Sequence, residues 1–123
     1  MENLHTGTGR VQPQDAAVFM EITLTEADGG IAGATFRCSE NETLARCGET
    51  LCGLLPGHPV TDLFLTDNNA VYYNIRPPLA RGELWMASVA VFAAKRAAAD
   101  WCKKNGVPVP ADETGCACLT ETD

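Results

Sequence analysis

The sequence predicts an α+β domain, in which a small antiparallel β-sheet packs against helices and a long helix lies toward the C-terminal end. Three observations lead to this prediction. Residues 18–24 alternate between apolar and polar side chains, which is the period of a half-buried strand. Residues 27–30 read Ala-Asp-Gly-Gly, a tight-turn sequence, and a return strand follows over 31–38. Residues 83–104 are rich in Ala and apolar around most of a helical circumference, which is typical of a buried helix.

The length of the chain suits one domain covering all 123 residues. Residues 1–15 are polar and contain Gly7, Gly9 and Pro13, so we expect a loose arm there. Residues 107–123 are acidic and contain two further prolines, so we expect a mobile tail.

Charge and composition bear on partners and location. The formal net charge of −7 argues against nonspecific nucleic-acid binding and favours a partner with a basic surface. No segment approaches the roughly 20 apolar residues that cross a membrane, and the first residues lack a signal-peptide core. We therefore expect a cytoplasmic protein, whose six cysteines are thiols, metal ligands or redox groups rather than disulfides.

A capped helix is predicted after the return strand, on which Ala32, Ala34, Phe36 and Cys38 share one face. Ser39 or Asn41 can cap this helix, and the pair at 56–57, Pro-Gly, ends it. Its apolar stripe consists of Leu44, Cys47, Leu51 and Leu54.

The segment between the two main helices is less regular. Residues 58–67 are compatible with a short helix or with an extended segment, and both alternatives stay open. Thr66 or Asp67 can cap a short helix through residue 73, and Pro77-Pro78 ends it. In the long helix, the expected buried side chains are those of Trp85, Val89 and Phe92, broadened by Leu84, Val91 and Trp101.

The order and spacing of these motifs resemble the NifU/IscU N-terminal family of iron–sulfur cluster assembly scaffolds. Residues 28–37 look like the family's turn and following strand, and residues 36–57 keep its spacing without a gap. Residues 66–78 resemble the segment that leads to its Leu-Pro-Pro, and residues 93–101 resemble its Ala-rich helix. The resemblance covers roughly residues 14–104 and implies a SufE/NifU-like fold.

The resemblance also implies an activity. Such scaffolds receive sulfur from a cysteine desulfurase, assemble a [2Fe–2S] cluster on three cysteines and usually an Asp, and pass it to recipient proteins. In this sequence the three cysteine positions hold Gln14, Asn41 and Met86, and Asp15 matches the Asp only with a shift of one residue. The expected cofactor is therefore an iron–sulfur cluster or a single Fe or Zn ion held by relocated ligands.

Candidate ligands among the cysteines each have a structural alternative. Cys38 lies close to a predicted helix N-terminus, which lowers a thiol pKa, and is either a relocated ligand or a small core residue. Cys47 is a metal ligand or a member of the apolar stripe, and Cys52 and Cys102 are expected to pack.

Other side chains outside the core could take part. Cys116 and Cys118 could bind a soft metal ion or relay sulfur, or belong to a dispensable tail. Asp15 is a further possible metal ligand, and Glu83 is either an acidic ligand or simply a favourable first-turn charge.

Three functions follow from this reading. The first is an iron–sulfur assembly protein, scaffold-like or accessory, that binds a cysteine desulfurase or a recipient protein. The second is a cofactor-free interaction module built on the scaffold fold. The third is a thiol-based sulfurtransferase with Cys38 as nucleophile. We expect the protein not to be an enzyme, because no catalytic base or oxyanion site is readable.

Overall fold

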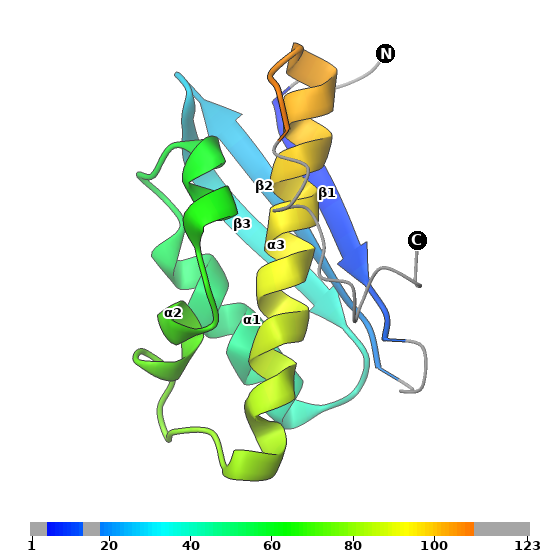
Figure 1. The fold of residues 1–123 in the computed structure, drawn as a ribbon, viewed down its shortest axis with the longest axis vertical. Helices are drawn as coiled ribbons and strands as arrows, with labels where there is room; N and C mark the ends of the chain where they lie inside the picture. The colour runs from blue at the N-terminus through cyan, green and yellow to red at the C-terminus, as the bar shows by residue number, and fades with distance from the viewer. Residues whose placement is uncertain (1–4, 14–17, 110–123) are drawn as a thin grey trace.

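The structure is a computed structural model that describes residues 5–13 and 18–109. Three antiparallel strands form one sheet in the order β1-β2-β3, with β1 at Thr6–Val11, β2 at Met20–Ala27 and β3 at Gly30–Cys38. The main helices are α1, Glu42–Leu54, and α3, Leu84–Asn105. The predicted α+β class, with a small antiparallel sheet packed against helices and a long last helix, is confirmed (Figure 1).

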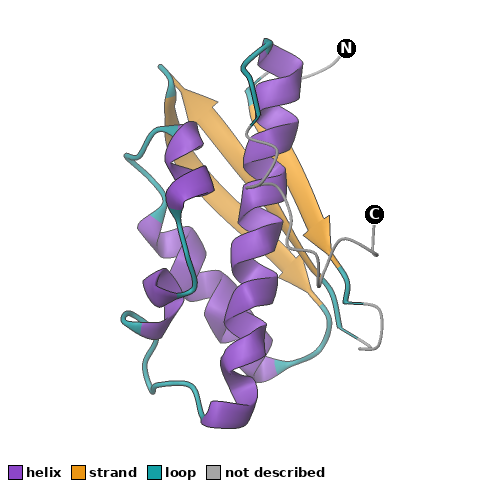
Figure 2. Cartoon of the chain, viewed as in Figure 1, coloured by secondary structure: helices purple, strands orange, loops and turns teal. Residues whose placement is uncertain are grey.

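The helices form one layer on one face of the sheet. The long helix α3 packs on β1 and β2, and α1 packs on β3. Along β2 the side chains of Met20, Ile22 and Leu24 face this layer and are buried, whereas the alternate residues are more exposed. Figure 2 shows the sheet behind the helices, so the core lies between these two layers.

The expectation of a loose arm over residues 1–15 is wrong for the segment that forms β1. Gly7 and Gly9 face α3 and are buried, and a Cβ added at Gly9 would collide with the backbone of Ala93 and Ala97. These glycines allow the strand to approach the helix closely, so they serve packing rather than flexibility. Val11, at the end of β1, is fully buried.

The predicted hairpin turn is confirmed. Asp28 and Gly29 have positive φ values of 56° and 85°, as a two-residue hairpin turn requires. Close to this turn, the β2–β3 ladder contains a bulge between Thr25 and Glu26. Because of it Ala32 is exposed and does not share the inner face with Phe36, whose register partner is the buried Ile22.

Helix α1 begins where a capping residue was predicted. The side chain of Asn41 accepts a hydrogen bond of 3.0 Å from the backbone N–H of Leu44. The predicted stripe points inward except at its last member, Leu54, which is 36% exposed. The ambiguous segment 58–67 contains a 3-10 helix, η1, at Val60–Leu65, and a short helix α2 follows at Asn69–Tyr72.

The core side of α3 is made mainly of small side chains. Its buried alanines are Ala87, Ala90, Ala93, Ala94, Ala97, Ala98 and Ala99. The expectation of a buried aromatic stripe is wrong at Trp85, which is 41% exposed, and at Leu84, which is 38% exposed. The first turn of α3 extends past the end of the sheet (Figure 1), and both side chains belong to this turn. No helix within the described residues is long and apolar enough to cross a membrane.

Candidate functional site

The N-terminal ends of α1 and α3 meet at one end of the molecule, the lower end in Figure 1. A second 3-10 helix, η2 at Arg81–Glu83, leads into α3. The hydroxyl of Thr43, in the first turn of α1, donates a 3.2 Å hydrogen bond to the carboxylate of Glu83. The same carboxylate accepts a 2.9 Å bond from the backbone N–H of Ala80. Glu83 therefore joins the start of α3 to the start of α1.

The corner between β3 and α1 is fixed by backbone-directed bonds. The N–H of Phe19 donates to the hydroxyl of Ser39 at 3.1 Å, and the N–H of Ser39 donates to the carbonyl of Phe19 at 3.1 Å. Cys38 is the last residue of β3 and pairs with Met20 in the ladder. The fold thus positions Cys38 three residues before the cap of α1.

Among the cysteines of the described residues, Cys38 is the one that is not buried. Burial nevertheless raises the pKa of its thiol above the ordinary value of 9.0. The helix-terminus argument predicts a lowered pKa, and the direction found is the opposite, because desolvation of the thiolate dominates. Cys38 is therefore a neutral thiol at neutral pH unless a metal ion or a partner displaces its proton.

Cys47 lies beneath this end, on the inner face of α1, and is fully buried. The pKa of its thiol is raised to about 11, mainly by burial; the charge of Arg46 acts against this rise and that of Glu83 adds to it. Cys52 and Cys102 are buried as well, and burial raises the pKa of Cys52 to about 11. These thiols have the properties of core residues.

The structure brings together only part of the predicted site. Asn41 and Met86, two of the positions that the resemblance aligns with cluster ligands, lie at the start of α1 and in the first turn of α3. Asn41 has a structural role as the cap, and Met86 packs partly buried against the core. The remaining candidates, Gln14, Asp15, Cys116 and Cys118, lie outside the described residues.

The described residues alone do not supply a metal site. Residues 5–13 and 18–109 contain no group of three or more His, Cys, Asp and Glu side chains placed to hold a metal ion. A [2Fe–2S] cluster takes four protein ligands, usually thiolates. Cys38 and Glu83 are thus candidate ligands without a complete set around them within these ranges.

Sequence reasoning missed two contributors to this end, Thr43 and Arg46. The guanidinium of Arg46 donates to the carbonyl of Pro77, and its Nε is buried without a hydrogen-bond partner. Thr43 binds Glu83 across 40 residues of sequence. Both contacts join residues that are far apart in the sequence, so no local sequence pattern predicts them.

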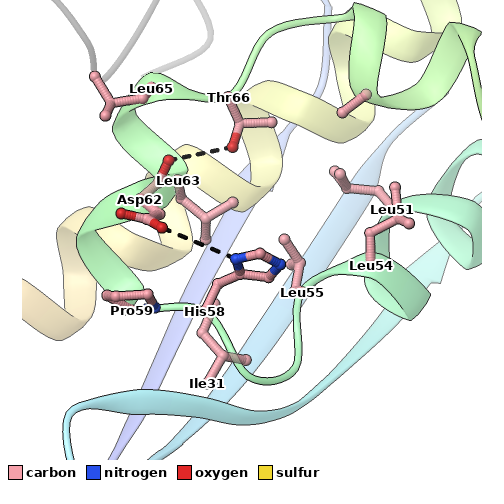
Figure 3. Close-up of a pocket in the computed structure, with 11 residues that line it drawn as sticks. Ile31, Leu51, Leu54, Leu55, His58, Pro59, Asp62, Leu63, Leu65 and Thr66 are labelled. Carbon is pink, nitrogen blue, oxygen red and sulfur yellow. Dashed lines mark hydrogen bonds and ion pairs between the residues drawn. The ribbon is translucent and has the colours of Figure 1, made fainter.

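An apolar pocket at the other end of α1 was also not predicted. It has a volume of about 300 Å³, is open to solvent, and is lined by residues of the end of α1, of η1 and of α2. Figure 3 shows the imidazole of His58 projecting between the α1 leucines and Asp62. The sequence signal for it is the cluster of leucines on both sides of Pro56-Gly57.

Comparison of the chain with models of known protein families and with curated proteins gave no match.

Proposed function

We propose that this protein is an accessory member of iron–sulfur cluster assembly, which binds a cysteine desulfurase or a recipient protein and exchanges sulfur or iron through Cys38. The proposal rests on the resemblance to the NifU/IscU scaffolds. The confirmed α+β arrangement, with a hairpin, a capped helix and a long last helix, is compatible with a SufE/NifU-like fold.

The position of Cys38 is the observation that carries the proposal. It is the cysteine within the described residues that is not buried, and it lies beside the α1 cap, where the resemblance would put a cluster ligand. Its raised pKa keeps the thiol protonated, so the proposed role requires that an iron ion or a partner displaces this proton. The same raised pKa disfavours an independent sulfurtransferase, which needs a thiolate nucleophile.

A cofactor-free interaction module is the second candidate. It is favoured by Asn41, whose side chain caps α1 instead of binding a metal, and by Cys47, which is a fully buried core residue. In this case the lower end of the molecule in Figure 1 serves as a protein-binding surface. Its exposed Leu84 and Trp85 would then contribute apolar contact area.

The deciding experiment is anaerobic reconstitution of the reduced protein with iron, cysteine and a desulfurase. Visible absorption, and iron and sulfide counted per chain, report what is bound. The accessory role predicts iron or persulfide sulfur on the wild type and its loss in Cys38→Ser. The double variant Cys116→Ser/Cys118→Ser is the matched control for ligands in the C-terminal segment.

The outcomes separate the candidates. Sulfur or iron retained by Cys38→Ser but lost in the double variant moves the site to Cys116 and Cys118. A folded wild type that acquires neither element but binds the desulfurase indicates the interaction module. A folded wild type that acquires neither and binds neither desulfurase nor recipient contradicts the proposal.

A further inference from the structure

The pocket at the C-terminal end of α1 has aliphatic walls. Leu51 and Leu55 of the α1 end, Leu63 of η1 and Ile31 of β3 line it, and all four are buried residues. The volume of about 300 Å³ lies at the lower end of the roughly 300–1,000 Å³ found for ligand sites. Such a cavity fits a large side chain better than a cofactor.

The rim of the pocket continues this apolar surface outward. Leu54 is 36% exposed and Leu65 is 83% exposed, and both border the cavity. A single exposed leucine is ordinary, but two beside an apolar cavity form a continuous surface. Because the apolar area extends beyond the cavity, the pocket suits a side chain inserted by a neighbouring chain better than an enclosed small molecule.

The pocket lining contains one acidic side chain, Asp62, and neither Lys nor Arg. All lining residues except Ile31 come from the segment 51–70, which contains no Lys or Arg and also holds Asp67. With a net charge of −7 for the whole chain, the field at this surface attracts cations.

Asp62 lies in the pocket wall and is available to a partner. Its contact with His58 is long, at 3.9 Å, and the two side chains are 52% and 61% exposed respectively. An exposed pair with this geometry contributes little stability, so a cation from another chain can compete for the carboxylate. Figure 3 shows the carboxylate of Asp62 next to the imidazole of His58, with a dashed line marking the contact.

We propose that this pocket docks a basic segment of a partner protein, which inserts one large apolar side chain between Leu51 and Leu63 and pairs an adjacent Lys or Arg with Asp62. The inserted side chain provides the affinity, because it and the exposed rim leave water together. The basic neighbour provides the orientation and the rate of encounter. This inference requires neither iron nor sulfur, so it can fail or succeed independently of the function proposed above.

The test uses a library of short random peptides displayed on phage and selected on the full-length protein. We expect the enriched sequences to contain a large aliphatic or aromatic residue next to Lys or Arg. The most enriched peptide is then synthesised, and its dissociation constant is measured at two salt concentrations.

Three variants locate the binding. Leu65→Ser is expected to weaken it about tenfold or more, as for loss of an apolar contact that forms on binding. Asp62→Asn is expected to weaken it several-fold and to reduce its salt dependence. Tyr73→Ser is the control, because Tyr73 is also strongly exposed, at 71%, but does not line the pocket. Leu65 is a surface residue, so its variant should keep the fold, which circular dichroism checks.

Four results would overturn the proposal. They are the absence of any enriched sequence, enrichment of acidic peptides, equal affinity of wild type and Leu65→Ser, and a wild-type dimer that Leu65→Ser converts to a monomer. The last result would assign the pocket to a second copy of the chain.

Discussion

At the scale of single residues, glycine determines how closely the sheet approaches its helix. Gly9 faces α3 at a point where a Cβ would overlap backbone atoms of Ala93 and Ala97, and backbone cannot rotate away as a side chain can. Gly33 of β3 has no atom near its missing Cβ and has an ordinary φ. The two positions are therefore a matched pair for testing this packing.

We predict that Gly9→Ala destabilises the protein by about 3 kcal/mol or more, because the extra methyl group forces β1 away from α3. Gly33→Ala should change the free energy of unfolding by less than about 0.5 kcal/mol. Urea unfolding followed by circular dichroism measures both. Equal stability of the two variants would mean that β1 does not pack on α3 as described.

Single residues also show which features of the structure could be predicted from the sequence. The strand β1 was missed because its inward positions are glycines, which give no apolar alternation, and the need for glycine comes from α3, about 90 residues later. The cap at Asn41 was predictable because it depends on residues within one turn. Cys38 was placed correctly at the corner, but its pKa direction depends on how much of the core surrounds it, which no local pattern reports.

At the scale of elements, α3 covers the outer edge of β1 with three side chains at intervals of four residues. Arg96 donates to the carbonyl of Arg10 at 3.0 Å, and Lys104 donates to that of Thr6 at 3.2 Å. Asp100 accepts from the N–H of Thr8 at 2.9 Å. Edge strands offer unpaired backbone groups to other chains, and this row of side chains occupies them.

We predict that Asp100→Ala lowers the free energy of unfolding by about 1 kcal/mol and increases aggregation, because the N–H of Thr8 loses its acceptor. Asp100→Asn keeps an oxygen acceptor and should lie between this variant and the wild type. Chemical unfolding and light scattering on heating measure the two effects. A variant Asp100→Ala as stable and as soluble as the wild type would show that the edge needs no cover.

Helix α3 was predictable from composition, but the elements that build the pocket were not. The Ala-rich run, with Gly106 in the left-handed conformation at its end, gave the correct boundaries within one residue. The pocket instead depends on how η1 and α2 fold back over α1, and the sequence of residues 58–67 was compatible with two conformations. A site made from the sides of three elements has no single sequence motif.

At the scale of the whole molecule, the carboxylate of Glu26 connects distant parts of the chain. It accepts hydrogen bonds from the N–H of Gly29 at 2.7 Å and from the indole N–H of Trp101 at 3.4 Å, and it pairs with His5 at 3.0 Å. The bond from Gly29, followed by that with His5, holds the pKa of Glu26 below its ordinary value of 4.5. A lowered pKa means that the folded state binds this proton less readily than the unfolded state does.

We predict that the contribution of Glu26 to stability is fully present above pH 4.5 and is lost as the pH falls through the lowered pKa of the folded state. Glu26→Gln should therefore show a weaker loss of stability with acid than the wild type. Urea unfolding at a series of pH values spanning 4.5 measures the difference. Glu40→Gln, at an exposed position, is the control; if the two variants share one pH profile, the Glu26 contacts do not couple folding to protons.

Because α3 covers the outer edge of β1, the two edges of the sheet differ in how accessible they are to a strand from another molecule. Strand β3 forms the other edge, where the backbone bonds found among residues 5–13 and 18–109 are those of Ile31 with residues 57 and 58, at the beginning of the strand. Within the described part of the chain, residues 33–38, next to Cys38, are the edge along which a strand from another molecule would pair. A continuous sheet built from many molecules would need two open edges in each molecule. The row of charged side chains on α3 bonds to the backbone of one of these edges, so the protection comes from the helix and not from the sheet.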